Sequence, residues 1–280
     1  MRKPVFTLTL ILLFGACKQH QSVTDSRQKR QYTFPYNLQQ PDKRYDLPGI
    51  LKEISGIAAV NDSIVACIGD ELGIVYFYNL NTNAIIRQLN FTDKGDFEDL
   101  TIIADTVYVL NSRGVIWSIK NYSSQQPQVN SYPLNIETPV ELEGLCEREN
   151  NLYIAAKYYH NKKRDTRGML PVWKLLLSSM QVQKPLFSLP DFIKNSSGSF
   201  VPFDASALLF NNKTRKWYFI SSHTKALLRC NESGHVIRQE ILSSQEFSQP
   251  EGLCFTPSGD LLISNEGKDG SPTILLFSKK

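Results

Sequence analysis

Short apolar runs alternate with turn residues along most of the chain, and they predict β-strands. Leu152 to Ala156, for example, follows a turn at 148–151, and Leu261 to Ser264 follows a turn at 256–260. Runs of this length, bounded by Gly, Pro, Asn and Asp, are typical of strands joined by hairpin turns. None of the repeating units shows a sustained 3.6-residue period, which argues against helical repeats. The pattern therefore predicts an all-β protein.

One short motif recurs five times. Its central residue is Glu or Ser, which a small or turn-prone residue and then Leu or Ile follow, and Glu, Asp or Gln stands two places before the centre. The central residues are Ser55, Glu98, Glu143, Ser206 and Glu251, separated by 43, 45, 63 and 45 residues. A period of about 44 residues is typical of a propeller blade or of a long helical repeat. The strand-like runs between the copies, four in a full unit, favour the propeller.

The last unit has only three strand-like runs, the third of which is Thr273 to Phe277. The missing fourth strand can come from the segment before the first copy, Lys43 to Leu51. Closing the ring in this way leaves only short, protected strand edges. We therefore predict a five-bladed β-propeller of four-stranded antiparallel blades over residues 43–280, with its ring closed by the N-terminal strand.

The polar candidates gather on one predicted face of the propeller. Successive strands of a blade run in opposite directions, so the start of each first strand and the end of each second strand share a face. The rim and ligand candidates at the second-strand ends are Glu71, Asn111, Lys157, His223 and Glu266. The long spacing of 63 residues adds further chain on the same face, where insertions often mark the binding side of a repeat protein. We expect an unknown protein or small-molecule ligand to bind there.

The three central Glu residues predict a metal site at the mouth of the channel. Carboxylates close together raise one another's pKa unless a cation is present. Oxygen ligands without a Cys or His cluster suit a hard ion, calcium before magnesium. The predicted metal ligands are Glu98, Glu143, Glu251, Ser55, Asp204 and Ser206. The alternative is that these side chains form hydrogen bonds to the backbone of neighbouring blades.

Two further rim residues have two interpretations each. Lys157 is either a fixed counter-charge within the carboxylate cluster or a solvated loop lysine. His223 is either a general base or a turn histidine with a structural role. The sequence offers no set of His, Asp and Ser that would support nucleophilic catalysis.

The five motif copies, the N-terminal leader and the run Ile54-Ser55-Gly56-Ile57-Ala58 together resemble the SdiA-regulated family and, more distantly, NHL-repeat proteins. The similarity covers roughly residues 45–280. It implies a five-bladed propeller with a bound calcium ion and no established enzymatic reaction. The positions that match the family's motif are Glu98, Glu143, Glu251 and Ser206. Asp99 and Ala207 depart from it, because the other copies have Gly there.

The first residues have the order of an export signal. Arg2 and Lys3 precede an apolar run from Val5 to Phe14, which ends at Gly15-Ala16-Cys17. Cys17 after Gly-Ala resembles the lipobox of a bacterial lipoprotein, which implies cleavage before Cys17 and its lipidation. The alternative is a plain signal peptide or membrane anchor. Residues 18–42 are rich in Gln, Ser, Lys and Arg and predict a disordered tether.

The net charge of +4 belongs to this leader and tether. The first 44 residues hold eight Lys and Arg against two Asp and Glu, which leaves 23 basic and 25 acidic residues in 45–280. The propeller region therefore gives no reason to expect nucleic acid. We expect contact with a membrane through the lipid anchor only.

The remaining cysteines are Cys67, Cys146, Cys230 and Cys254, and all four lie in strand-like runs. No Cys-x-x-Cys pair indicates a metal or redox site. We predict buried free thiols.

The sequence thus predicts an extracytoplasmic, lipid-anchored, calcium-binding propeller that acts as a binding or scaffold module at the cell envelope. The outer membrane is expected, because Lys18 is not the Asp that retains lipoproteins in the inner membrane of enteric bacteria. The alternative is a calcium-dependent hydrolase of the propeller lactonase or phytase type, in which the metal polarises a carbonyl or phosphoryl oxygen. A structural propeller without metal is a third reading. The lack of a Gly-x-Ser-x-Gly nucleophile motif favours a binding module over an enzyme.

Cys17→Ser tests the anchor. The substitution removes the sulfur that would carry the lipid, so we expect the protein to move from the membrane fraction to the soluble fraction. Cell fractionation followed by immunoblotting measures this. A variant that still sediments with membranes would show that the lipobox interpretation is wrong.

Overall fold

The computed structural model describes residues 34–280 apart from 137–139, 162–165 and 269. Within these residues the chain forms β-strands and one three-residue 3-10 helix, η1 (Gly49–Leu51). No helix in this part of the chain is long and apolar enough to cross a membrane. The predicted all-β class is confirmed. The predicted signal, Cys17 and the tether up to residue 33 lie outside the described residues.

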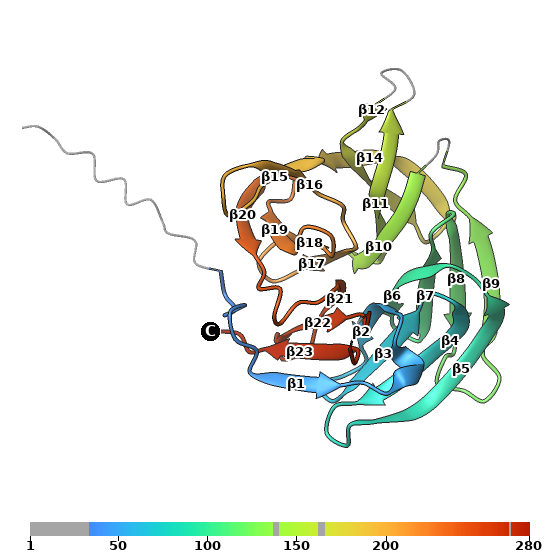
Figure 1. Cartoon of the computed structure of the whole chain (residues 1–280). Helices are drawn as coiled ribbons and strands as arrows, with labels where there is room; N and C mark the ends of the chain where they lie inside the picture. The colour runs from blue at the N-terminus through green and yellow to red at the C-terminus, as the bar shows by residue number, and fades with distance from the viewer. Residues whose placement is uncertain (1–33, 137–139, 162–165, 269) are drawn as a thin grey trace, which may run out of the picture. The chain divides into compact units, whose positions relative to one another are not determined.

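Five antiparallel sheets of four strands each form the blades (Figure 1). From the axis outward, the first two blades are β2 (Ile54–Ala59), β3 (Ile64–Gly69), β4 (Leu72–Asn79) and β5 (Ala84–Lys94), then β6 (Phe97–Ile103), β7 (Thr106–Asn111), β8 (Val115–Lys120) and β9 (Gln128–Pro133). The third is β10 (Val140–Arg148), β11 (Asn151–Asn161), β13 (Leu170–Leu176) and β14 (Gln181–Leu189). The last two are β17 (Ala207–Asn211), β18 (Lys216–Ser221), β19 (Ala226–Cys230) and β20 (Val236–Ile241), then β21 (Pro250–Phe255), β22 (Leu261–Asn265), β23 (Thr273–Phe277) and β1 (Lys43–Asp46). The predicted five blades of four strands are confirmed.

The inner strands form a closed circle around the axis. Strand β2 contacts both β6 and β21, β10 contacts β6 and β17, and β17 contacts β21. Every motif copy lies at the start of an inner strand or directly before it. The fold therefore brings five distant segments of the sequence to one end of a common channel, which we call the motif face. The hairpin turns that follow the inner strands lie at the other end, the turn face.

The N-terminal strand pairs with the last strand of the chain, as the sequence predicted. In β1, Lys43 lies opposite Leu276, and Asp46 lies opposite Thr273. The strand is shorter than the predicted segment, because Pro48 interrupts the ladder and η1 follows it. Whether this strand is what holds the ring closed stays a prediction.

The folded chain begins before β1. Tyr36 and Leu38 are 4% exposed, and the Tyr36 hydroxyl donates a hydrogen bond of 2.9 Å to the carbonyl oxygen of Gly259 in a turn of the last blade. Phe34 packs edge-on against Tyr36 and Tyr218. Residues 34–38 therefore pack on the propeller, although the sequence placed them in a disordered tether. The side chains of Phe34, Tyr36 and Leu38 hold this segment on the propeller.

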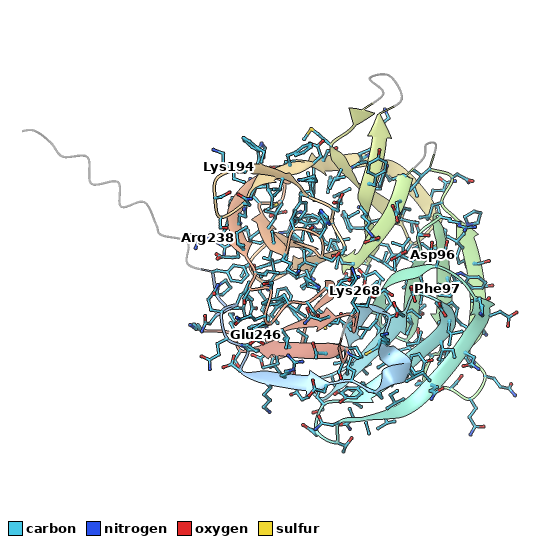
Figure 2. All side chains as sticks on the ribbon, in the orientation of Figure 1. Asp96, Phe97, Lys194, Arg238, Glu246 and Lys268 are labelled. Carbon is cyan, nitrogen blue, oxygen red and sulfur yellow. The ribbon has the colours of Figure 1, made fainter. Side chains whose placement is uncertain are left out.

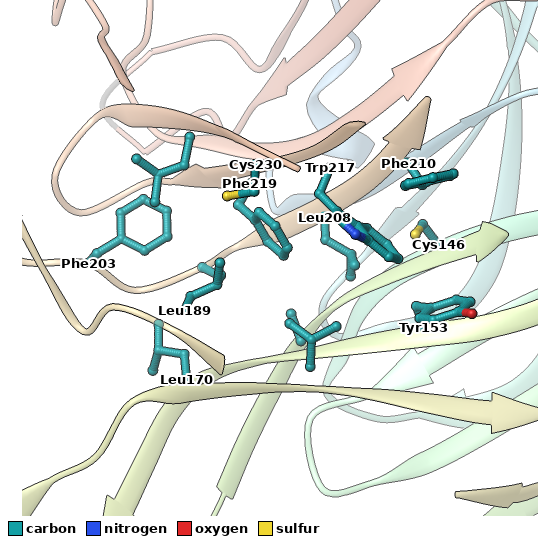
Figure 3. Packing of buried hydrophobic residues seen from close by; sticks show 14 of the residues in the cluster. Cys146, Tyr153, Leu170, Leu189, Phe203, Leu208, Phe210, Trp217, Phe219 and Cys230 are labelled. Carbon is teal, nitrogen blue, oxygen red and sulfur yellow. The ribbon is translucent and has the colours of Figure 1, made fainter. Parts of the chain in front are cut away.

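The hydrophobic core consists of five clusters, and each joins two neighbouring blades. Between the third and fourth blades, Trp217 lies at the centre (Figure 3), with its ring 4.5 Å from that of Phe210 and 5.1 Å from that of Tyr153. The four cysteines of the propeller are buried and free, as predicted. Because the core lies between blades, blade contacts rather than single blades carry the stability.

Two additions to the blades account for the long spacing of 63 residues. Strand β12 (Thr166–Arg167) extends the hairpin of β11, and β15 (Phe192–Lys194) pairs with β16 (Phe200–Pro202) in a separate hairpin. Ile193 and Val201 attach this hairpin to the core between the third and fourth blades. Phe200 on its other side is 69% exposed.

A truncation that begins at Glu53 tests the closure. It removes β1 and leaves the edge of β23 unpaired, and an unpaired edge is a template for association with other chains. We expect aggregation or loss of cooperative unfolding, measured by size-exclusion chromatography and a thermal melt. A truncation that begins at Thr33 is the control, because it keeps Phe34 to Leu38. A soluble protein that begins at Glu53 and melts like the control would show that β1 does not hold the ring closed.

Candidate functional site

The centre of the motif coincides with a β-bulge in four of the five inner strands. The pairing of the inner strand with its neighbour shifts register around Ser55, Glu98, Glu143 and Glu251. In the fourth blade, Ser206 directly precedes β17. A bulge leaves one residue out of the ladder and re-aims its side chain. The motif therefore marks the places where the chain turns a polar side chain out of the sheet.

The small residue after the motif centre is required by the neighbouring blade. A Cβ atom on Gly56 would lie 2.6 Å from the Cα atom of Asp99, and one on Gly144 would lie 2.9 Å from the backbone nitrogen of Leu208. These contacts are with backbone, which has no freedom to move aside. Glycine thus permits the close approach of adjacent inner strands.

Asp99 replaces glycine in the second copy and ties two blades together. Its Oδ2 accepts a hydrogen bond of 2.7 Å from the backbone N–H of Leu145 in the third blade, and its Oδ1 accepts one of 2.8 Å from the N–H of Leu100. Burial raises the pKa of Asp99 well above its ordinary value, although these two bonds oppose the rise. Asp99, the residue that departs from the motif, therefore forms a contact between the second and third blades.

Ser55 and Ser206 hold the glutamate of the next blade. The Ser55 hydroxyl donates a hydrogen bond of 2.7 Å to the carbonyl oxygen of Phe97, which precedes Glu98. The Ser206 hydroxyl donates one of 3.0 Å to the carbonyl oxygen of Pro250, which precedes Glu251. The structure thus shows a positioning contact for both serines, where the sequence predicted metal ligands. The contacts go to backbone carbonyl groups of the neighbouring blade.

Glu98, Glu143 and Glu251 form a cluster at the channel mouth, where the charge of each raises the pKa of a neighbour. Glu143 is 3% exposed, and its Oε1 forms an ion pair with Nζ of Lys157. Burial, followed by the charge of Asp96, raises the pKa of Glu98 to about 8, and Lys157 opposes this rise. Burial and the charge of Glu98 raise the pKa of Glu143 well above its ordinary value. A protonated Glu98 and a charged Lys157 thus compensate the carboxylates at neutral pH.

Lys157 stays positively charged. Burial alone lowers the pKa of its amine, but Glu143, Glu251 and Glu141 raise it above its ordinary value. The side chain is 34% exposed, whereas that of Glu143 is 4% exposed. Of the two interpretations of Lys157, the fixed counter-charge agrees with this geometry.

A second set of polar residues belongs to the same motif. These residues stand two places before each motif centre, at Glu53, Asp96, Glu141, Asp204 and Gln249. Asp96 lies at the start of β6 (Figure 2) and accepts a hydrogen bond from Ser112. Gln249 donates a hydrogen bond of 3.0 Å to Glu251 and another to Glu266. Glu53, Glu141 and Gln249 were not among the predicted site residues, although their regular place in the motif was a signal for them.

Glu266 belongs to the same electrostatic system. Burial, a hydrogen bond with Glu53 and the charge of Glu251 raise its pKa to about 7. Asp70 lies near the same group, and burial and the charges of Glu53 and Glu71 raise its pKa. The junction of the first and last blades is therefore a second acidic part of the rim.

The other predicted rim residues have more modest surroundings. Glu71 is exposed in the turn between β3 and β4, and His223 is exposed in the turn between β18 and β19. The Asn111 side chain accepts a hydrogen bond of 3.0 Å from the N–H of Arg113, so it supports its own turn. Asp204 is half-buried two residues before Ser206.

The donor atoms of the cluster suit a hard cation, since all are oxygens. Their arrangement is not that of a completed metal centre. Within the described residues, no group of three or more His, Cys, Asp or Glu side chains is placed to hold a metal ion. Within the described residues, the ammonium group of Lys157 is the cation that pairs with Glu143 of this cluster.

The solved structures that are similar to this chain include two that share its fold over most of its length. Glutaminyl cyclase of Myxococcus xanthus is 13% identical, with a TM-score of 0.61 over 85% of this chain and 95% of that one. A protein of unknown function from Bacteroides thetaiotaomicron is 14% identical, with a TM-score of 0.53 over 81% of this chain and 56% of that one. No family model and no curated protein matches the sequence. At these identities the likeness shows the fold alone: the chain is a five-bladed β-propeller protein.

Glu98→Gln tests the electrostatics of the cluster. A carboxyl group whose pKa is raised in the folded state contributes stability below its ordinary pKa, and this contribution is lost as the pH rises through the folded pKa. For Glu98 the window runs from 4.5 to about 8. We expect the free energy of unfolding of the wild type to fall across this window, and the substitution to remove roughly 3–5 kcal/mol of that fall.

Urea unfolding at several pH values in the presence of a chelator measures this effect. Asp105→Asn is the matched control, because Asp105 is exposed at the turn between β6 and β7 on the turn face. The same pH dependence in Glu98→Gln and in the control would show that Glu98 ionises as an ordinary surface carboxyl group.

Proposed function

We propose that this chain is a calcium-binding β-propeller that acts as a binding module, with the cation held by Glu98, Glu143 and Glu251. One observation carries the proposal: three glutamates from three different blades are re-aimed by bulges into one cluster, where burial raises the pKa of each. Such a cluster costs desolvation and charge repulsion. A divalent cation would relieve both.

The scaffold supports a site that several blades share. The hydroxyl groups of Ser55 and Ser206 and the carboxylate of Asp99 fix the inner strands relative to one another. A site whose residues are held in place by such hydrogen bonds keeps its geometry without help from the ligand. The β15–β16 hairpin continues directly from the outer strand of the third blade and leads into the fourth motif copy, so it belongs to the motif face.

The location follows from the sequence. We propose that the protein is exported, lipidated at Cys17 and held at the cell envelope, in the outer membrane. We also propose a relationship with the SdiA-regulated family, on the motif positions Glu98, Glu143, Ser206 and Glu251. The bulges at three of these positions support a shared structural role for the motif.

Calcium should stabilise the fold by mass action. At a hundredfold excess over the dissociation constant the gain is about 2.7 kcal/mol. We expect calcium to raise the melting temperature and chelation to lower it. Glu143→Gln should reduce that shift, because it removes the most buried carboxylate of the cluster, and Asp105→Asn should leave it unchanged. Thermal melts in calcium and in chelator, with metal content by elemental analysis, measure this.

Metal-free wild-type protein that shows no shift on calcium addition would contradict the proposed site.

Glu149 also lies on the turn face, but it is unsuitable as a control for Glu143→Gln. Its Oε1 is 2.6 Å from Nη1 of Arg215, within a network that joins the third and fourth blades through Arg148 and Glu232. Removing its charge would change stability for unrelated reasons.

A calcium-dependent hydrolase is the second candidate, and one observation favours it. Lys157 pairs with Glu143, so an ammonium group lies beside the carboxylates where a bound cation could polarise a carbonyl or phosphoryl oxygen. A panel of lactone, ester and phosphoester substrates separates the two functions. Calcium-dependent turnover that Glu98→Gln and Glu143→Gln abolish would establish the hydrolase in place of the binding module.

A further inference from the structure

We infer that Lys157 is a built-in counter-ion of the channel mouth, and that an external cation has to displace its ammonium group in order to reach Glu143. The inference rests on the proposed cation site and adds the residue that sets its affinity and its preference for divalent ions.

The local structure of the third blade builds Lys157 into the cluster. Where β10 and β11 pair, Leu142 lies opposite Ala156, Glu141 lies opposite Tyr158, and Gly144 lies opposite Ala155. The register therefore skips Glu143 on one strand and Lys157 on the other. These two bulged residues are the partners of the ion pair. Two neighbouring bulges thus aim a carboxylate and an ammonium group at each other.

The equivalent positions of the other blades show that a cation here is unusual. In each blade the equivalent residue of the second strand lies two places beyond the partner of the residue that follows the motif centre. These residues are Asp70, Ser112, Lys157, Ser222 and Glu266. Together with the motif centres and the residues two places before them, this makes fifteen positions. Nine of them are Asp or Glu, and Lys157 is their only lysine or arginine. The ammonium group of Lys157 is therefore the one positive charge among nine acidic side chains at these positions.

The covalent attachment of Lys157 to its strand decides which ions can compete with its ammonium group for Glu143. Lys157 is held at a high effective concentration by the strand that carries it. A free monovalent ion would replace one positive charge by another and would lose its translational freedom, so it gains nothing. A divalent ion adds one net positive charge to a ring that is rich in carboxylates. The lysine thus rejects monovalent ions and lowers the affinity for divalent ones, because the ion pair with Glu143 has to break.

Calcium titration of the full chain tests this competition. Lys157→Met keeps most of the side-chain volume and removes the charge, and Lys157→Arg keeps the charge. Lys184→Met makes the same chemical change on the exposed outer strand β14. Isothermal titration with calcium chloride should give a dissociation constant at least about tenfold lower for Lys157→Met than for the wild type. Lys157→Arg and Lys184→Met should stay close to the wild type.

The titration separates the two proposals. If the wild type binds calcium and Lys157→Met binds it no more tightly, the inference is overturned and the proposed function stands. If Lys157→Met binds calcium and the wild type does not, the lysine excludes the ion, so the inference stands and the proposed function fails.

A second measurement decides the case in which no variant binds calcium. Lys157→Ala removes the three methylene groups beyond Cβ and the ammonium group, and a small alkylammonium ion can occupy that space. We expect n-propylammonium chloride to raise the melting temperature of Lys157→Ala, and n-propanol to have no such effect. Wild type and Lys184→Ala should not respond to the ammonium ion. Equal responses in Lys157→Ala and Lys184→Ala would overturn the inference.

Discussion

The close approach of five inner strands around one axis is the constraint on which the rest of the structure depends. Backbone atoms of neighbouring blades come so near that Gly56 and Gly144 have no room for a side chain. Asp99 stands where three of the copies have glycine, and its side chain bridges to the next blade. The bulges lie next to these close contacts, and they bring the polar side chains to the channel mouth. The position of the candidate site therefore depends on how the inner strands pack.

The electrostatics of the mouth follow from that packing. Carboxylates that a bulge turns out of the sheet lie beside one another because the strands do, and burial leaves them little water. The structure offsets this with a protonated Glu98, with the ammonium of Lys157, and with the amide of Gln249 beside Glu251. The carboxylates that would attract a cation thus lower the stability of the ring. A channel mouth with less charge would make a more stable protein.

The sequence predicted the fold well, because strand periodicity and a repeat near 44 residues are local signals that recur. It placed the three glutamates on one face for the same reason. It could not predict the partners of Ser55 or Asp99, since a hydrogen bond to the next blade depends on a register between residues more than forty positions apart. It also extended the tether too far, because Tyr36 and Leu38 are too few to form a periodic pattern and acquire their partners only in the folded blades.

The N-terminal segment that packs near Gly259 also determines how the molecule can be presented. The backbone N–H of Lys280 donates a hydrogen bond of 3.0 Å to the carbonyl oxygen of Pro35, so both ends of the propeller leave from the turn face. A lipid at Cys17 would be joined to Phe34 by a leash of at most about 60 Å. The turn face, where residues 34 and 280 lie, is opposite the acidic mouth. A label or fusion partner at the C-terminus would sit on the turn face and leave the mouth uncovered.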